Sequence, residues 1–302
     1  MSRLEDMAIL VEVVDRGGFS AAAARLALSK QLVSRRITDL EARLGVQLLL
    51  RTTRRIALTD LGREFVDRAR RILQDADEAE QAMSSHGAAP RGTLRLSVPL
   101  SFGLSDLSPM LIGFMRLQPG VEIDLDLSDR PVDLVADGFD MAIRIGALAD
   151  STLIARKLSD LAFGICASPD YLRQRGEPET IEDLKHHSCL LFRHSKGLSW
   201  LFQLRGKLER VAVSGILRAN NGEVLRDAAI AGLGLVQLPE FITGPALNDG
   251  RLVPVLAAFA PPAGAVYAVH PAHRQRSATV RALSDHLAVC FSDPASSPIY
   301  NR

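Results

Sequence analysis

Five polar side chains recur on one side of a helix predicted near the N-terminus: Lys30, Gln31, Ser34, Arg35 and Thr38. Their residue types are those that contact nucleic acids, since Arg and Lys pair with guanine, Gln pairs with adenine, and hydroxyls bind bases or phosphates. Ser29 stands just before them, where its side chain would cap the first helical turn. Charged helix faces are more often plain solvated surface, so this face alone leaves both interpretations open.

Three short helices are predicted to position this face. Apolar residues at helical spacing predict a first helix over Leu4–Asp15, which ends at Gly17-Gly18. Phe19 and Ser20 suit a hydrophobic staple and an N-cap for a second helix over residues 21–26. In the third helix the side opposite the polar face is an apolar stripe of Val33, Ile37, Leu40 and Leu44, and Gly45 ends the helix. The arrangement is a helix-turn-helix at about residues 19–38.

Two further elements follow the third helix. Residues 48–58 predict two short strands around Thr53-Arg54, a wing whose three arginines would contact phosphates or enter a minor groove: Arg51, Arg54 and Arg55. Thr59 then suits the N-cap of a long helix with a heptad-spaced apolar row, formed by Phe65, Ala69, Ile72, Ala76, Ala79 and Met83. The row is too narrow for a buried core helix, which favours pairing with a second copy. A two-fold dimer would present two third helices to a palindromic site.

The net charge of +1 hides an uneven distribution. Residues 1–71 contain 14 Lys and Arg against 9 Asp and Glu, whereas the rest of the chain contains 22 against 26. A basic N-terminal part favours contact with a polyanion.

Composition bounds the class of protein. The 302 residues are 47% hydrophobic and 24% charged, as in ordinary globular proteins. No apolar run reaches the ~18 residues of a membrane helix, and the early acids Glu5 and Asp6 argue against a secretory signal. Three widely spaced cysteines form no disulfide framework. We therefore expect a cytoplasmic protein with no membrane partner.

A linker over residues 84–92 precedes a region in which strands and helices alternate. Strand, helix, strand, helix and strand are predicted in turn at Leu94–Val98, Leu104–Leu117, Val121–Leu127, Val132–Ala136 and Met141–Ile145. A second set has strands near 162–167, 190–192, 211–217, 233–237 and 252–255, with helices near 170–175, 223–231 and 240–247. The strand Val266–His270 and the helix Ala278–Phe291 follow. The alternation indicates an open, mainly parallel sheet with helices on its faces.

Ligands of such sheets bind beyond the carboxyl ends of the strands. Ser101 follows the first strand and opens a helix, Arg144 lies near the end of the third strand, and Asn221 precedes another helix. Their donors suit a small molecule that often carries a carboxylate. N-capping by Ser101 and a surface salt bridge of Arg144 are the structural alternatives.

The motifs of the N-terminal part form a series without gaps: Gly18-Phe19-Ser20-Ala21-Ala22-Ala23, Ser29, Val33-Ser34-Arg35-Arg36-Ile37, Leu40-Glu41, Leu44-Gly45, Arg51-Thr52-Thr53-Arg54 and Leu58-Thr59. This series resembles the N-terminal domain of LysR-type transcriptional regulators. Residues 132–146, 231–239 and 250–256 resemble the effector domain of the same family, so the resemblance covers nearly the whole chain. It implies sequence-specific binding to double-stranded promoter DNA, modulated by a small-molecule effector. It also implies a homodimer or homotetramer that is not an enzyme and needs no cofactor.

The resemblance further implies an α+β multidomain chain with a two-lobed, periplasmic-binding-protein-like effector domain. The expected bounds are 1–59 for the winged helix-turn-helix, 60–86 for the dimerisation helix, 87–91 for a hinge and 92–302 for the effector domain. Lobe I would comprise about 92–161 and 267–302, and lobe II about 162–266, with crossing strands near Leu161–Gly164 and Val266–Pro271. A carboxylate or aromatic effector between the lobes would meet Ser101, Phe102, Arg144 and Asn221, with Phe163, Phe192 and Gln237 from the second lobe.

Other chemistry is less well supported. His186, His187, Cys189 and His194 match no common zinc spacing, so no metal is predicted. Cys166 and Cys189 stand in apolar strands where a thiol is not activated, and Asp124 and Asp126 share the outer face of one strand. The chain has no GxSxG elbow, no HExxH and no P-loop. The competing hypothesis is a solute-binding or enzymatic α/β domain whose N-terminal part serves only for oligomerisation.

Overall fold

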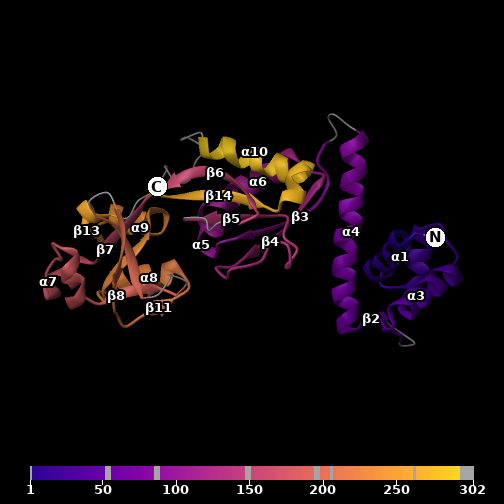
Figure 1. Cartoon of the computed structure of the whole chain (residues 1–302), viewed down its shortest axis with the longest axis horizontal. Helices are drawn as coiled ribbons and strands as arrows, with labels where there is room; N and C mark the ends of the chain where they lie inside the picture. The colour runs from indigo at the N-terminus through magenta and orange to yellow at the C-terminus, as the bar shows by residue number, and fades with distance from the viewer. Residues whose placement is uncertain are drawn as a thin grey trace. The chain divides into compact units, whose positions relative to one another are not determined.

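The structure is a computed structural model that describes residues 2–51, 56–84, 89–146, 151–193, 198–204, 207–260 and 263–292. The chain divides into two compact units, Met1–Ala88 and Ala89–Arg302. Figure 1 labels the helices and strands of both units. Among the described residues, no helix combines the length and the apolar character that a membrane span requires.

The N-terminal unit contains three helices, a hairpin and a long fourth helix. Their bounds are α1 Arg3–Asp15, α2 Phe19–Arg25, α3 Lys30–Leu44, β1 Leu49–Arg51, β2 Ile56–Leu58 and α4 Asp60–Ser84. The apolar sides of the helices meet in one core, which includes Leu10, Val13, Val33, Ile37, Leu40 and Val66. Within this core α1 packs against both α3 and α4.

The helix ends of this unit follow the sequence signals in part. The Ser29 hydroxyl accepts a hydrogen bond from the Leu32 amide at 3.2 Å, and the Thr59 hydroxyl accepts one from the Gly62 amide at 2.9 Å. The predicted cap at Ser20 is wrong, because α2 already begins at Phe19 after Gly18, which has no side chain to cap with. Leu44 is 39% exposed rather than buried, since the buried part of α3 ends at Leu40.

The C-terminal unit contains two five-stranded sheets. The first has the order β4-β3-β5-β14-β6, with bounds β3 Gly92–Val98, β4 Val121–Leu127, β5 Met141–Ile145, β6 Ile154–Leu161 and β14 Gly264–His270. The second has the order β11-β8-β12-β7-β13, with bounds β7 Phe163–Ala167, β8 Cys189–Phe192, β11 Arg218–Ala219, β12 Leu235–Pro239 and β13 Val253–Val255. Both sheets are mixed rather than mainly parallel, since each contains two parallel and two antiparallel strand pairs.

Helices cover both sheets (Figure 1). On the first sheet lie α6 Ser108–Leu117 and α10 Ala278–Ser292, and on the second lie α8 Gly222–Ile230 and α9 Glu240–Asn248. The short helix α7 Pro169–Arg175 follows β7. The helix predicted from Leu104 begins earlier, with α5 Leu100–Phe102 and a π-helical turn over Gly103–Leu107 before α6.

The chain crosses between the sheets twice. It leaves the first sheet at Ala162, between β6 and β7, close to the predicted crossing. It returns before Gly264, so the crossing predicted at Val266–Pro271 is wrong: Val266–Val269 pairs with β5, and β14 pairs with β6 along its whole length. We call the two halves lobe I, with the first sheet, and lobe II, with the second.

Two further element predictions are wrong. No helix forms over Val132–Ala136: residues 134–138 are turns, and Asp133 and Asp137 close this short loop, since the Asp137 amide donates to the Asp133 carbonyl at 2.8 Å and the Asp137 carboxylate accepts from the Asp133 amide at 3.0 Å. Residues 211–217 are not one strand. Instead, β9 Ser199–Leu204 and β10 Lys207–Ala212 form an antiparallel hairpin that buries Trp200 and Phe202.

Candidate functional site

The polar face of α3 is open to solvent in the N-terminal unit. Lys30, Gln31, Arg35 and Thr38 are exposed, and Ser34 is half-buried. The Arg35 side chain is 81% exposed and makes only a loose ion pair with Asp39, at 3.8 Å. The Thr38 hydroxyl donates to the Ser34 carbonyl at 3.0 Å. The apolar stripe on the opposite side anchors the helix, so this face is free to meet a ligand along its first two turns.

The hairpin β1–β2 adjoins the C-terminal end of α3. The Glu41 carboxylate of α3 accepts hydrogen bonds from the Leu48 and Leu49 amides at 2.8 and 3.0 Å, which fixes the hairpin to the helix. The two strands pair in antiparallel register from Leu49 opposite Leu58 to Arg51 opposite Ile56. Arg54, Arg55 and the side chain of Arg51 lie outside the described residues.

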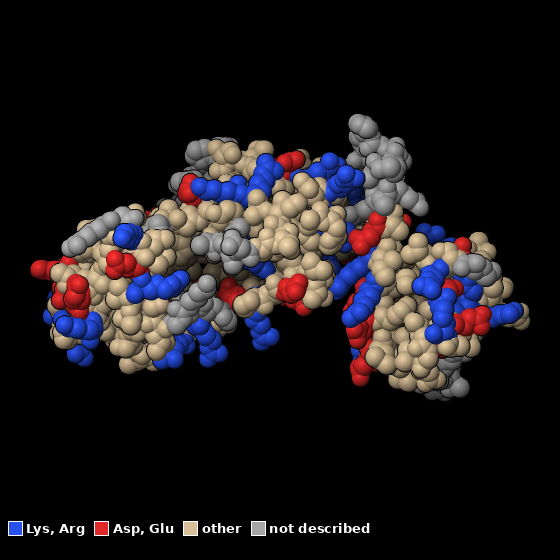
Figure 2. Space-filling view, viewed as in Figure 1, with Lys and Arg blue, Asp and Glu red and all other residues tan. Residues whose placement is uncertain are grey.

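Charges of both signs accompany this basic unit. In Figure 2 acidic and basic side chains lie next to one another along α4. Several of them are paired within the helix, such as Arg68 with Glu64 at 2.7 Å and Arg70 with Asp67 at 3.4 Å. These arginines are therefore neutralised by close acids, whereas Arg35 on α3 has only the loose 3.8 Å ion pair with Asp39.

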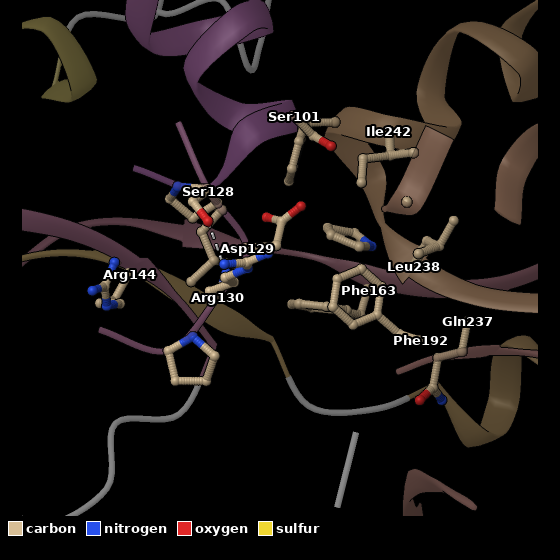
Figure 3. A pocket seen from close by; sticks show the side chains of 16 residues that line it. Ser101, Ser128, Asp129, Arg130, Arg144, Phe163, Phe192, Gln237, Leu238 and Ile242 are labelled. Atoms are coloured by element: carbon tan, nitrogen blue, oxygen red, sulfur yellow. Dashed lines mark hydrogen bonds between the residues drawn. The ribbon is translucent and has the colours of Figure 1, made fainter. Parts of the chain in front are cut away.

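A cavity of about 470 Å³ lies between the two lobes of the C-terminal unit (Figure 3). Its walls come from both sheets: Pro99, Ser101, Ser128, Asp129, Arg130, Pro131, Arg144, Ile145, Phe163, Phe192, Gly222, Gln237, Leu238, Pro239, Phe241 and Ile242. Most of these residues stand at or just beyond the carboxyl ends of strands, as expected for open sheets. Five of the seven predicted pocket residues line this cavity: Ser101, Arg144, Phe163, Phe192 and Gln237.

Arg144 is the least satisfied polar group of the cavity wall. Its Nη1 donates to the Ile143 carbonyl at 3.0 Å and to the Ser97 hydroxyl at 3.4 Å, whereas its Nη2 is buried without a hydrogen-bond partner among the described residues. Burial lowers the pKa of the Arg144 guanidinium below its usual value. A half-buried cation without a carboxylate partner favours an incoming anion, since that anion would supply both the charge and the acceptor.

Ser101 links the two lobes. Its hydroxyl donates a short hydrogen bond to the Glu223 carboxylate of α8, and the Asn221 amide donates to the Ser101 oxygen at 3.4 Å. Asn221 does not line the cavity, because its side-chain oxygen caps α8 by accepting from the Val224 amide at 3.1 Å. Ser101 and Asn221 are therefore close together, as predicted, but they bind Glu223 and the helix end.

The aromatic candidates fall into two groups. Phe163 and Phe192 line the cavity and belong to β7 and β8 of lobe II. Phe102 does not line it: its ring is fully buried, edge-on to Phe241 and stacked on Phe291. Because successive residues of a helix point about 100° apart, the side chain next to Ser101 points into the core of lobe I.

Gln237 reaches the cavity but its amide is already engaged. Its Nε2 donates to the Leu201 carbonyl at 3.0 Å and its Oε1 accepts from the Leu201 amide at 3.4 Å. Gln237 thus holds the hairpin β9–β10 against the sheet. In the view of Figure 3, Arg144 and Gln237 lie on opposite sides of the cavity, with Asp129 and Arg130 between them.

The sequence reasoning missed Asp129 and Arg130. Both follow β4, and Asp129 accepts a hydrogen bond from the Leu100 amide at 3.2 Å. The rule that pointed to Ser101 and Arg144, the carboxyl end of a strand, also applies to the residues after Leu127. The sequence analysis also missed Arg36, a buried neighbour of Arg35. Val33 and Leu40 lie three residues before and four residues after it, so helical spacing places Arg36 on the buried side of α3.

The metal and thiol predictions concern the second lobe. Among the described residues, no three His, Cys, Asp or Glu side chains are grouped to hold a metal ion; His194 lies outside that range. Burial raises the pKa of the Cys166 thiol and of the Cys189 thiol to about 12 in each case. Both thiols therefore stay protonated and unreactive at neutral pH.

Comparison with known proteins assigns both units of the chain to families. Residues 4–63 match the bacterial regulatory helix-turn-helix proteins of the lysR family, and residues 87–290 match the LysR substrate binding domain. The chain belongs to the LysR family of transcriptional regulators. An HTH-type transcriptional regulator of Xanthomonas campestris pv. campestris is 37% identical to it over 289 residues, which cover 94% of this chain and 84% of that protein.

Two solved structures extend the comparison to the whole fold. CrgA, a LysR-type transcriptional regulator from Neisseria meningitidis, is 32% identical with a TM-score of 0.56, over 95% of this chain and 99% of that one. The full-length virulence activator AphB of Vibrio cholerae is 27% identical with a TM-score of 0.59, over 95% and 98%. This LysR-family regulator thus joins a helix-turn-helix DNA-binding domain to an effector-binding domain. Proteins of the family bind promoter DNA and small-molecule effectors and form oligomers.

Proposed function

We propose that the regulator reads its operator through the exposed face of α3. Lys30, Gln31, Ser34, Arg35 and Thr38 contact base edges or phosphates, with Ser29 at the helix start. The observation that carries this proposal is the 81% exposure of the Arg35 side chain on a helix whose other side is fixed in the core. Arg51, Arg54 and Arg55 of the wing contact backbone phosphates and set the overall affinity.

The dimer forms through α4. Along its heptad row, Ala69 is buried and Phe65 packs on the core of the N-terminal unit, whereas Ile72 is 41% exposed. The first part of the row is thus used inside the unit. The exposed Ile72 supports pairing with a second copy through the later part of the helix, as a homodimer or a homotetramer.

The effector is a small carboxylate with an apolar or aromatic body. Its anionic group pairs with Arg144, and its body packs on Phe163 and Phe192, which lie on the opposite wall. Ser101 and Gln237 shape the site through their contacts with Glu223 and Leu201. Asn221 acts through Ser101, and Phe102 supports the site from the core of lobe I.

The molecule acts by binding and not by catalysis, and it does so in the cytoplasm. Its DNA-binding domain comprises about residues 1–59, its dimerisation helix 60–86 and its effector domain 92–302, with a hinge over 87–91. The names of its relatives as transcriptional regulators support the first point. Closure of the two lobes on the effector changes the spacing of the paired DNA-binding domains and with it the bending of the promoter.

A selection experiment tests this function. Fragments of the host genome are incubated with the full-length chain, and the retained fragments are sequenced. We expect a small set of fragments with a shared palindrome, and retarded bands in gel shifts with those fragments. Retention of all fragments alike, or of none, would contradict the proposal and favour a solute-binding or enzymatic protein.

A further inference from the structure

Two adjacent arginines of α3 have opposite environments. The Arg35 side chain is 81% exposed, whereas the Arg36 side chain is 9% exposed. A buried guanidinium is costly unless it is paired and hydrogen-bonded, so its partners define its role.

The partners of Arg36 lie in the first turn of α1. Its Nε donates to Asp6 Oδ1 at 2.6 Å, and its Nη2 donates to Glu5 Oε2 at 3.0 Å. The other oxygen of the same Asp6 carboxylate pairs with Nη1 of Arg43 at 3.0 Å, two helical turns further along α3. Two cations on one side of α3 are thus held by two acids of α1.

The helix that carries these acids is itself fixed. At its C-terminal end, Asp15 of α1 forms an ion pair with Arg70 of α4. Apolar residues of α1 also pack against α3 and α4 in the common core. The acids at the start of α1 are therefore a rigid reference point and not a flexible arm.

We infer that Arg36 is a positioning residue for DNA recognition: its bonds to Glu5 and Asp6 fix the rotation of α3 about its own axis. This inference rests on the proposed role of the α3 face in reading bases. Apolar contacts alone allow small rotations of the helix, because they have no directional preference. Hydrogen bonds from a guanidinium to carboxylates are directional, so they resist such a rotation.

The geometry of base contacts explains why rotation matters. A helix with side chains is about 10–12 Å across, so a turn of about 20° moves a side-chain tip by roughly 2 Å. Hydrogen bonds to base edges tolerate only a few tenths of an ångström, whereas phosphate contacts through flexible side chains tolerate more. Loss of the restraint should therefore reduce sequence discrimination more than general DNA affinity.

The test compares the full-length regulator with its Arg36→Met variant on the selected operator and on a scrambled duplex. We expect operator affinity to fall about 10-fold or more, while affinity for the scrambled duplex stays within about twofold. The slope of log K against log salt should not change, because Arg36 touches no phosphate. A slope reduced by about 1 would show that Arg36 contacts a phosphate and would overturn the inference. An unchanged preference for the operator over the scrambled duplex would also overturn it.

Thermal unfolding of each variant separates positioning from stability. In the double variant Arg36→Met with Asp6→Leu, an apolar pair replaces the ion pair, and such replacements often retain stability. We expect its melting temperature to return close to that of the wild type while operator preference stays reduced. Recovery of both the melting temperature and the operator preference would show that apolar packing at this position is enough, and would overturn the inference. If Arg36→Met alone does not fold, the double variant decides whether Arg36 has a positioning role.

A neighbouring variant distinguishes this inference from the proposed function. Arg35→Met should reduce operator preference without affecting the melting temperature. If Arg35→Met reduces the preference and Arg36→Met does not, only the positioning role fails. If the wild type selects no sequence, the proposed function itself fails.

Discussion

The Ser101 hydroxyl of lobe I donates a hydrogen bond to the Glu223 carboxylate of lobe II, so the two lobes are joined directly at the edge of the cavity between them. The Asn221 amide donates to the same hydroxyl oxygen at 3.4 Å. The N-terminal ends of α5 and α8, one from each lobe, therefore meet through side chains of this chain. An effector that separates or closes the lobes must change this contact.

Ser101→Ala should loosen the contact between the lobes. The free energy of unfolding should fall by about 1.5–3 kcal/mol, the usual net contribution of a hydrogen bond to a charged group. Hydrogen exchange followed by mass spectrometry should show faster exchange in the first turns of α5 and α8. Ser105→Ala, at the neighbouring π-helical turn, is the control and should leave α8 unchanged; unchanged exchange in Ser101→Ala would contradict an interlobe role.

Arg144→Met should stabilise the free protein while it weakens effector binding. Arg144 has a buried Nη2 without a described partner and a pKa lowered by burial, so its charge is held at a cost. Removal of that cost should raise the melting temperature by about 2 °C. Arg116→Met, at an exposed position of α6 that does not line the cavity, is the matched control and should change neither property. A lower melting temperature in Arg144→Met would mean that its bonds to Ser97 and Ile143 outweigh the cost.

His187 should make the stability depend on pH in a defined direction. Burial lowers its pKa below the usual 6.5, and its Nδ1 lies 3.2 Å from the Tyr171 hydroxyl. The folded protein therefore holds His187 neutral, and the unfolded chain takes up the proton first as the pH falls. The stabilising contribution of neutral His187 is therefore fully present above about pH 6.5 and is lost as the pH falls below that value. His187→Asn should flatten the melting temperature between pH 7 and 5, while the exposed His186→Asn should not.

Thiol titration should distinguish the three cysteines. The pKa of about 12 for Cys166 and for Cys189 predicts no reaction of either with a disulfide reagent at pH 8 in the native state. The half-buried Cys290 is the one described thiol open to slow reaction. All three should react once the chain is unfolded in guanidinium. Fast reaction of Cys166 or Cys189 in the native protein would contradict the burial of that thiol.

Local patterns in the sequence predicted the parts of the fold that local physics determines. The cap at Ser29, the turn at Gly45 and the stripe from Val33 to Leu40 depend on residues only a few positions apart. The cavity residues Ser101 and Arg144 followed from the rule on strand ends. These signals predicted which elements carry the exposed face of α3 and part of the cavity wall.

Contacts between distant residues were not predictable in the same way. The bond of Gln237 to Leu201 depends on the hairpin β9–β10, which the sequence pattern did not predict. The contrast between Arg35 and Arg36 depends on two acids that precede Arg36 by 30 and 31 residues. Glu223 was not a candidate at all, because its partner Ser101 is 122 positions away.

The central claim is that α3 reads bases through its exposed face, and Arg35→Ala tests it most directly. Dissociation constants are measured for the wild type and the variant on the selected operator and on a scrambled duplex at one salt concentration. The account predicts a loss of about 10-fold on the operator and little change on the scrambled duplex, since one base contact contributes about 1–3 kcal/mol of discrimination. An equal loss on both duplexes would assign Arg35 to the phosphate backbone and contradict the claim.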